Sequence, residues 1–195
     1  MDDAERPHSA RRDELLELAY SYCLEHGLTD LSLRPLAAAI GSSPRVLLFL
    51  FGSKDGLVAA LLGRARVAEL AMLDEMHLEG RGCGNLAATV LVLWRWLAAP
   101  EHRPLLTLWL EAYARSLVEP AGPWAGFAVA TVEDWLALLD AARGAGRHRT
   151  KAGAAEATLA LSVLRGALVD LLASGDLRRT TAAVERAAAC LGPSA

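Results

Sequence analysis

The chain has 195 residues, of which 53% are hydrophobic and 22% are charged, so it is long enough to bury a substantial core. Its formal net charge of -3 excludes a protein that coats nucleic acid nonspecifically, because such a protein would be strongly basic. Any DNA binding must therefore depend on a local patch of positive charge.

The N-terminal end and the cysteines bear on where the protein works. The segment MDDAERPHSARR is acidic and then basic, without an apolar stretch, so we expect no secretory signal and a cytoplasmic protein. Cys23, Cys83 and Cys190 are widely spaced and lack a C-x-x-C pair. We therefore expect buried thiols rather than disulfides or a zinc site.

A first helix is predicted from about Ser9 to Gly27, after a polar arm at residues 1–8 that we expect to be frayed. Apolar residues recur along this helix at intervals of three and four, which gives one stripe suited to covering two further helices. The stripe consists of Leu15, Ala19, Tyr22, Cys23 and His26.

Two short helices joined by a tight turn are predicted next. Ser32 is expected to cap the first of them through its hydroxyl, and Gly41 to end it, because glycine enters a left-handed turn without a steric penalty. Ser43 and Pro44 are typical of the start of the second helix, which runs as far as Gly52. This arrangement has the geometry of a DNA-reading helix-turn-helix.

These residues resemble the N-terminal domain of the TetR family, the tetracycline-repressor-like transcriptional regulators. The resemblance covers roughly residues 10–66, and the motif stands behind a helix ending Glu25-His26-Gly27. Its members are Ser32, Leu36-Ala37, Gly41, Ser43, Leu47, Phe51, Ser53-Lys54 and Leu57. It extends weakly to the C-terminus through LSVLRGALVDLLASGD, which is similar to the penultimate helix of many members. One departure is Leu48-Phe49-Leu50, which stands where the family carries Tyr and His side chains that contact DNA phosphates.

The resemblance implies a dimeric, ligand-responsive regulator that binds a palindromic operator in double-stranded DNA. The second helix of the motif would lie in the major groove, with Arg45 as the best candidate to hold a guanine through two hydrogen bonds. The predicted DNA contacts are Ser32, Arg34, Ser43, Pro44, Arg45, Val46, Phe49 and Lys54.

A long helix is predicted from Lys54 to about His77, and it would connect the DNA-reading domain to the rest of the chain. Lys54 lies in its first turn, where the positive end of the helix dipole favours acidic residues. A DNA phosphate held by the free amides and by Lys54 would account for this placement. The alternative is a solvated lysine neutralised by Asp55.

The body of the chain is expected to be helical, because it lacks strand-like alternation and is rich in Ala and Leu. Its predicted helices span residues 85–98, 100–118, 124–143, 152–173 and 177–191, with a break at 79–84 and a Gly-rich basic loop at 144–151. The whole chain is therefore all-α. We divide it into a helix-turn-helix domain at 1–53, with the motif at 32–51, a connecting helix at 54–77, and a ligand-binding and dimerisation domain at 78–195.

Aromatic side chains of the body are candidates for the walls of a small-molecule pocket, which the resemblance implies, although such residues are more often ordinary core. They are Trp94, Trp109, Tyr113, Phe127 and Trp135. The ligand would be apolar or aromatic, because few charged residues, mainly Arg95 and Glu111, fall among them.

The apolar helix at residues 152–173 is expected to form a homodimer interface together with the last helix. It is apolar nearly all round, so it must be covered on two sides, and the last helix covers it only in part. Three charges, at Glu156, Arg165 and Asp170, disfavour a membrane span. The predicted interface residues are Leu161, Leu164, Leu168, Leu171, Val184 and Leu191.

Motifs for catalysis are absent from the sequence. There is no G-x-x-x-x-G-K-[ST], no G-x-S-x-G and no histidine pair at ligand spacing, so we expect no enzyme, no cofactor and no metal site. The interpretation is a repressor that releases its operator when an apolar ligand enters the body. Two alternatives stay open: a dimeric ligand-binding or interaction protein whose head has lost DNA affinity at Leu48-Phe49-Leu50, and a small-molecule enzyme.

Overall fold

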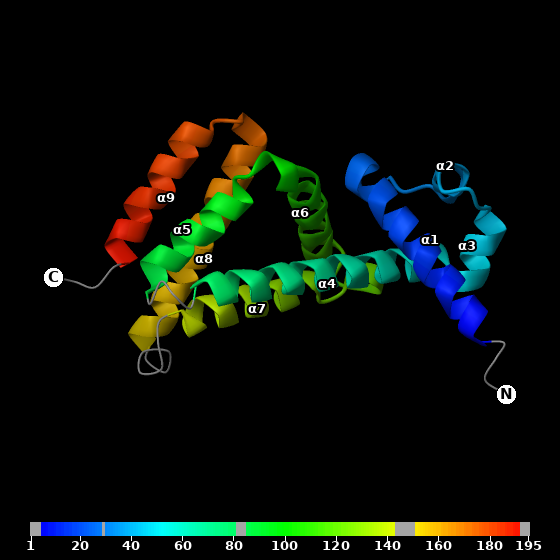
Figure 1. Cartoon of the computed structure of the whole chain (residues 1–195), viewed down its shortest axis with the longest axis horizontal. Helices are drawn as coiled ribbons and strands as arrows, with labels where there is room; N and C mark the ends of the chain where they lie inside the picture. Colours follow the sequence, from blue (N-terminus) through cyan, green and yellow to red (C-terminus); the bar gives the residue numbers. More distant parts are fainter. Residues whose placement is uncertain (1–4, 29, 81–84, 143–150, 192–195) are drawn as a thin grey trace. The chain divides into compact units, whose positions relative to one another are not determined.

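A computed structural model describes residues 5–28, 30–80, 85–142 and 151–191, without the side chains of 5–8 and 77–80. These residues form helices and contain no strand, which confirms the all-α class. The elements in Figure 1 are α1 (Glu5–His26), α2 (Leu33–Ala39), α3 (Pro44–Phe51), α4 (Lys54–Gly80), α5 (Leu86–Leu97), η1 (Pro100–His102), α6 (Arg103–Val118), η2 (Gly122–Trp124), α7 (Phe127–Ala141), α8 (Lys151–Ser174) and α9 (Leu177–Leu191).

The helix bounds follow the sequence signals closely, with differences near the ends of several helices. Helix α7 begins at Phe127 rather than at Trp124, which belongs to the 3-10 turn η2. Residues 5–8 belong to α1 rather than to a frayed arm, and the rest of the expected arm, residues 1–4, lies outside the described residues. Helix α4 continues to Gly80, into the expected break. The rest of that break, 81–84, and nearly all of the predicted basic loop also lie outside the described residues.

The chain groups into two compact units that alternate along the sequence. Unit 1 consists of Met1–Ala68 and Pro104–Ala128, and unit 2 of Glu69–Arg103 and Val129–Ala195. The sequence predicts that residues 104–128 belong to the body, whereas in the structure they group with α1, α2 and α3. The physical reason is a shared core, because Leu108 and Ala112 of α6 are buried with the apolar residues of the N-terminal helices.

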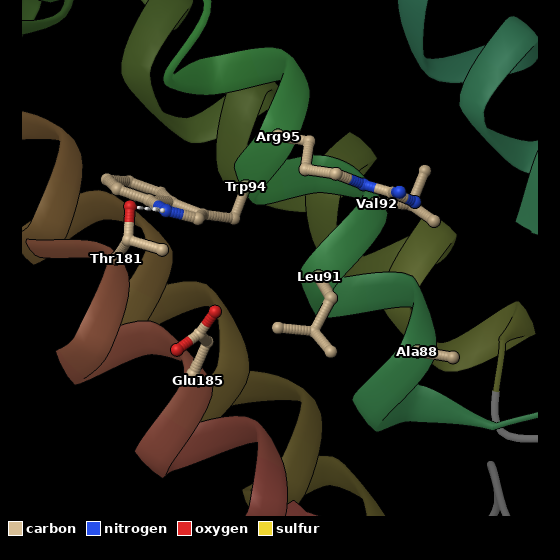
Figure 2. A pocket seen from close by; sticks show the side chains of 7 residues that line it. All are labelled: Ala88, Leu91, Val92, Trp94, Arg95, Thr181 and Glu185. Carbon is tan, nitrogen blue, oxygen red and sulfur yellow. Dashed lines mark hydrogen bonds between the residues drawn. The ribbon is translucent and has the colours of Figure 1, made fainter. Parts of the chain in front are cut away.

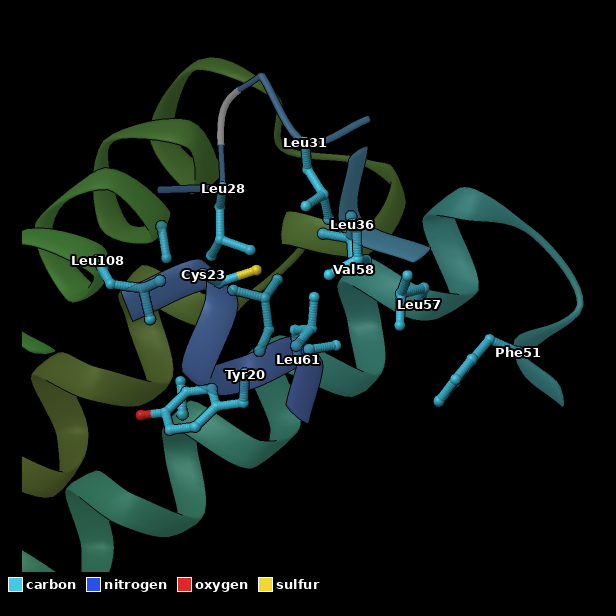
Figure 3. Close-up of a cluster of buried hydrophobic side chains, with 14 of the residues drawn as sticks. Tyr20, Cys23, Leu28, Leu31, Leu36, Phe51, Leu57, Val58, Leu61 and Leu108 are labelled. Atoms are coloured by element: carbon cyan, nitrogen blue, oxygen red, sulfur yellow. The ribbon is translucent and has the colours of Figure 1, made fainter. Parts of the chain in front are cut away.

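One hydrophobic core holds unit 1 together (Figure 3). Tyr20 and Cys23 of α1, Leu36 of α2 and Leu61 of α4 belong to this cluster, and Leu108 joins it from α6. Burying each leucine contributes about 1.5 to 3 kcal/mol relative to leaving it exposed. The core therefore fixes α2 and α3 against α1, and leaves their opposite sides to solvent.

Unit 2 is built around α5, α8 and α9, which pack side by side (Figure 1). The turn from α8 to α9 passes through Gly175, at a φ of 69°. Arg179 closes this turn with two hydrogen bonds of 2.6 Å to the carboxylate of Asp170. The pair lowers the pKa of Asp170 chiefly through the hydrogen bond from Arg179.

Two further expectations concern the thiols and the apolar helix α8. Cys23 is buried as expected, whereas Cys190 is exposed and Cys83 lies outside the described residues. By length and composition α8 could cross a membrane, and it is the only single helix in the described part of the chain that could. This is weak evidence for a span, because core helices of water-soluble proteins meet the same test and one stripe of α8 is buried in unit 2.

Candidate nucleic-acid interface

Helices α2 and α3 meet at a sharp turn that local residues define. The chain bends by 103° between them, within the range for a helix-turn-helix. Gly41 has a φ of 64°, and the amide of Ser42 donates to the carbonyl of Ala37 at 2.8 Å. At the start of α3, the hydroxyl of Ser43 accepts the amide of Val46 at 3.2 Å, with Pro44 in the first helical position. The turn therefore forms as the sequence predicts.

Ser32 differs from the expectation. It precedes α2 with an extended backbone, but its side chain makes no capping hydrogen bond, so the prediction of a hydroxyl cap is wrong. The contact to the first turn is instead made by its backbone carbonyl, which accepts the amide of Leu36 at 3.2 Å. The side chains of Ser32 and Arg34 are both exposed at the start of α2.

Helix α3 has an inward and an outward side. Leu47 and Phe51 are buried in the core of unit 1. Of the three residues that depart from the family pattern, Leu50 packs partly buried against this core, while Leu48 and Phe49 are exposed. The outward side therefore combines the positive charge of the exposed Arg45 with apolar side chains.

Lys54 lies exposed in the first turn of α4. The hydroxyl of Ser53 accepts the amide of Gly56 at 2.9 Å, so one amide of this helix N-terminus already has a partner. Among the described residues, none forms an ion pair with Lys54, and the neighbouring Asp55 is exposed as well. Lys54 therefore makes no ion pair with Asp55, the partner that the alternative interpretation gives it.

The end of α1 is held from α6, which lies far away in the sequence. A carboxylate oxygen of Glu111 accepts the amide of Leu28 at 2.8 Å. Gly27, with a φ of 81°, precedes this contact, and a Cβ there would lie 3.1 Å from the same oxygen. Burial, and secondarily the charge of Glu111, raise the pKa of the Cys23 thiol to about 12. Glu111 therefore anchors the connection between α1 and α2 through the amide of Leu28.

Ion pairs and ring contacts hold α1 against α3 and α4. The guanidinium of Arg64 donates to Glu17 at 2.5 Å and lies over the ring of Tyr20, 4.8 Å from its centroid. Arg12 lies over the ring of Phe51 at 5.0 Å. The guanidinium groups of Arg12 and Arg64 are therefore engaged in contacts within unit 1, so neither residue is a candidate DNA contact.

Unit 2 contains a groove between α5 and α9, with a volume of about 330 Å³ (Figure 2). Leu91 points into it from α5, and the carboxylate of Glu185 borders it from α9. The indole nitrogen of Trp94 donates to the hydroxyl of Thr181 at 2.9 Å, which fixes the ring across the two helices. The remaining lining residues are Ala88, Val92 and Arg95. A mainly apolar groove with a few polar groups is suited to an amphipathic small molecule.

The five aromatic candidates for a ligand pocket do not share one site. Trp94 lines the α5–α9 groove, and Trp135 is buried elsewhere in unit 2, where its indole donates to the buried Glu69 at 2.8 Å. Trp109 and Tyr113 belong to unit 1, with ring centroids 5.2 Å apart, and Phe127 lies in the core of that unit.

Sequence reasoning missed Glu69, Thr181 and Glu185, because single polar residues on helices give no periodic signal.

Among known proteins, the chain matches solved structures but no family model and no curated sequence. A solved transcriptional regulator from Rhodococcus sp. Rha1 is 22% identical and has a TM-score of 0.75, covering 92% of this chain and 95% of its own. A TetR transcription regulator from Haloarcula marismortui is 18% identical, with a TM-score of 0.64 and coverage of 94% and 95%. The chain has the fold of TetR-family regulators.

A third structure with the TetR fold is the multidrug binding protein EbrR, which was solved in complexes with imidazole and with proflavin. The imidazole complex is 22% identical, with a TM-score of 0.65 and coverage of 95% of this chain and 92% of that chain. The proflavin complex is also 22% identical, with a TM-score of 0.56 and coverage of 91% and 99%. At these identities the likeness establishes the TetR fold.

Helix α8 of this TetR fold has a buried and an exposed side, and the buried side holds the predicted interface. Buried within unit 2 are Leu161, Leu164, Leu168 and Leu171 of α8 and Val184 of α9. The structure differs here from the sequence analysis, because α5 and α9 of the same chain already cover these side chains. Leu191 is partly buried. The exposed stripe of α8 instead carries Ala155, Leu159, Ser162, Gly166, Val169 and Ala173.

Proposed function

We propose that the protein is a cytoplasmic, ligand-responsive transcriptional regulator that binds a palindromic operator as a homodimer and acts as a repressor. The single observation that carries this proposal is the helix-turn-helix, with its 103° bend and the exposed outward side of α3. In this proposal residues 1–53 read DNA, residues 54–77 connect, and residues 78–195 bind the ligand and dimerise. Because residues 104–128 group with unit 1, we propose that α6 also supports the DNA-reading helices.

The proposed DNA contacts are those on the outward side of α2, α3 and the start of α4. Arg45 is exposed near the N-terminal end of α3, where recognition helices contact base edges. Lys54 would contact a phosphate. The full proposed set is Ser32, Arg34, Ser43, Pro44, Arg45, Val46, Phe49 and Lys54.

The proposed ligand is an apolar or aromatic small molecule. Support comes from the groove beside Trp94 and from the complexes of EbrR with imidazole and proflavin. Trp109, Tyr113, Phe127 and Trp135 stay secondary candidates, since each has a place in the core or in a tilted ring pair. Ligand would favour one separation of the two DNA-reading heads and operator another, with residues 54–77 carrying the difference.

The proposed dimer is formed by the exposed stripe of α8 and the neighbouring surface of α9. Leu159 and Val169 are 52% and 46% exposed on this stripe. The hydroxyl of Ser162 donates to the carbonyl of Thr158 at 2.8 Å, so this polar group already has a partner within α8 and could be buried in an interface. Gly166 has nothing within 4 Å of its Cβ position, so a second helix could approach there closely. Such an isologous contact would pair two heads for the two halves of a palindrome.

Selection of bound sequences from a random DNA pool tests the DNA-binding function. The expected result is enrichment of a palindrome, and Arg45→Ala should relax the sequence preference at one position of each half-site. A good bidentate pair between arginine and guanine is worth about 1 to 3 kcal/mol of discrimination. Lack of enrichment would instead favour a ligand-binding protein whose head has lost DNA affinity, for which Leu48 and Phe49 are the motivating observation.

A panel of apolar and aromatic compounds tests the ligand. Tryptophan emission and melting temperature should both respond, because a ligand at about a hundred times its dissociation constant stabilises by roughly 2.7 kcal/mol. Leu91→Glu would place a charge inside the α5–α9 groove and should remove the response. A response that Leu91→Glu leaves unchanged would place the ligand elsewhere.

A further inference from the structure

The outward side of α3 carries an apolar patch whose contact on DNA the proposed function leaves unassigned. Phe49 is 73% exposed and Val46, three residues earlier on the same side of the helix, is 38% exposed. The helix has other apolar residues, Leu47 and Phe51, that are buried in the core of unit 1. Phe49 and Val46 are therefore displayed toward solvent, although α3 has an inward side that takes apolar residues.

The exposed faces of Phe49 and Val46 form a small apolar patch on the candidate recognition helix, where they are available for an apolar contact. For a helix that lies in the major groove, the possible apolar partners are few. Among the base edges in this groove, the C5 methyl of thymine is the one methyl group and the largest apolar target. A phenylalanine has no group that donates to a phosphate, so contact with the DNA backbone through a hydrogen bond is excluded for this side chain.

The spacing between Arg45 and this patch limits how far apart along the DNA their two contacted base pairs can lie. Arg45 lies four residues before Phe49, which corresponds to about 6 Å along a helix. Successive base pairs are about 3.4 Å apart. A base pair held by Arg45 and one that contacts Phe49 would therefore lie one or two steps apart in the same half-site.

We infer that Val46 and Phe49 form a thymine-reading patch, which packs against the C5 methyl of one thymine in each operator half-site. The thymine lies one or two base pairs from the position that Arg45 reads. This inference rests on the proposed DNA-binding function and adds to it the residue and the base that set part of its specificity. Leu50 takes no part, since it packs against the core.

The test replaces single thymines of the selected operator by deoxyuridine, which removes the C5 methyl and leaves every hydrogen-bonding group in place. The wild-type protein should lose affinity at one thymine per half-site. Burial of one methyl group corresponds to about a fourfold change per half-site, or about fifteenfold when both half-sites are substituted. Fluorescence anisotropy with labelled operators measures both values.

Two variants assign the effect to the patch. Phe49→Ala should bind the thymine operator more weakly and should bind the thymine and deoxyuridine operators equally. Leu48→Ala is the matched control, because Leu48 is also exposed, at 40%, but lies on the flank of α3. It should keep the deoxyuridine penalty. Both side chains are exposed, so both variants should melt close to the wild type.

Three outcomes overturn the inference. A wild-type protein that binds its operator but tolerates every single deoxyuridine would refute the thymine contact and leave the DNA-binding function intact. An unchanged penalty in Phe49→Ala would assign the methyl to another residue. A protein that enriches no sequence from the random pool would refute the DNA-binding function itself, and the thymine contact with it.

Discussion

Removing the carboxylate of Glu111 is expected to destabilise unit 1, although Glu111 lies far in sequence from the helices it supports. The carboxylate accepts the amide of Leu28 at 2.8 Å, and Leu28 is only 2% exposed. In Glu111→Ala this buried amide would lose its acceptor, which costs about 1 to 3 kcal/mol. For a chain of this length the melting temperature should fall by roughly 2 to 12 °C.

Urea denaturation of the wild type and three variants measures this effect. Glu111→Gln keeps an oxygen in reach of the Leu28 amide, so it should lie between the wild type and Glu111→Ala. Glu119→Ala is the control just past the end of the same helix, since Glu119 pairs with Arg115 at a more exposed position and should cost less than about 1 kcal/mol. A midpoint for Glu111→Ala equal to that of Glu119→Ala would refute the reasoning, because the amide would then be satisfied by another acceptor or by water.

Two further predictions concern the buried thiol and the dimer. Because the pKa of Cys23 is raised to about 12 from 9.0, the unfolded chain releases this proton first, and stability should fall as pH rises through that interval. The decline should be steeper for the wild type than for Cys23→Ala, by at most about 1.4 kcal/mol per pH unit, in denaturation curves at successive pH values. Val169→Glu, on the exposed stripe of α8, should give monomers by light scattering, while Leu117→Glu, at a still more exposed position of α6, should not. A monomeric wild type at micromolar concentration would contradict the proposed dimer.

Local signals made the helix-turn-helix predictable. Gly41 needs a positive φ, Ser43 accepts an amide three residues later, and Pro44 fits a first helical position, so each residue specifies its own backbone without help from distant parts of the chain. Ser32 shows the limit of such signals. Its side chain could have capped α2 but adopts another direction, and the backbone carbonyl makes the contact instead.

Contacts between distant segments were not predictable from periodicity. Glu111 and Leu28 are 83 positions apart, and Glu69 and Trp135 are 66 apart, so no sequence spacing reveals either hydrogen bond. The two sides of α8 show the same difficulty. Periodicity correctly placed Leu161 and Leu168 on one stripe, but only the packing of α5 and α9 decides that this stripe faces its own chain.

The apolar outward side of α3 also has a consequence for the salt dependence of DNA binding. Leu48-Phe49-Leu50 stands where the family resemblance implies two polar side chains on phosphates, so we expect this head to have fewer anchors and its affinity to depend weakly on salt. Each phosphate neutralised contributes about 0.9 to the slope of log affinity against log salt concentration, so Lys54→Ala, which acts twice in a dimer, should lower the slope by roughly 1.8. The only other lysine of the chain, Lys151, begins α8, and Lys151→Ala is the matched control with an unchanged slope.

Anisotropy titrations of the selected operator at several salt concentrations give these slopes. Lys54→Ala should weaken binding to all operator variants alike, since a phosphate contact carries no base preference. If the slope of Lys54→Ala equals that of Lys151→Ala, Lys54 is a solvated residue and the α4 N-terminus contacts no phosphate. If the wild-type protein fails to bind even at low salt, the exposed Leu48 and Phe49 have replaced the DNA anchors without a substitute, and the ligand-binding alternative becomes the better account of this chain.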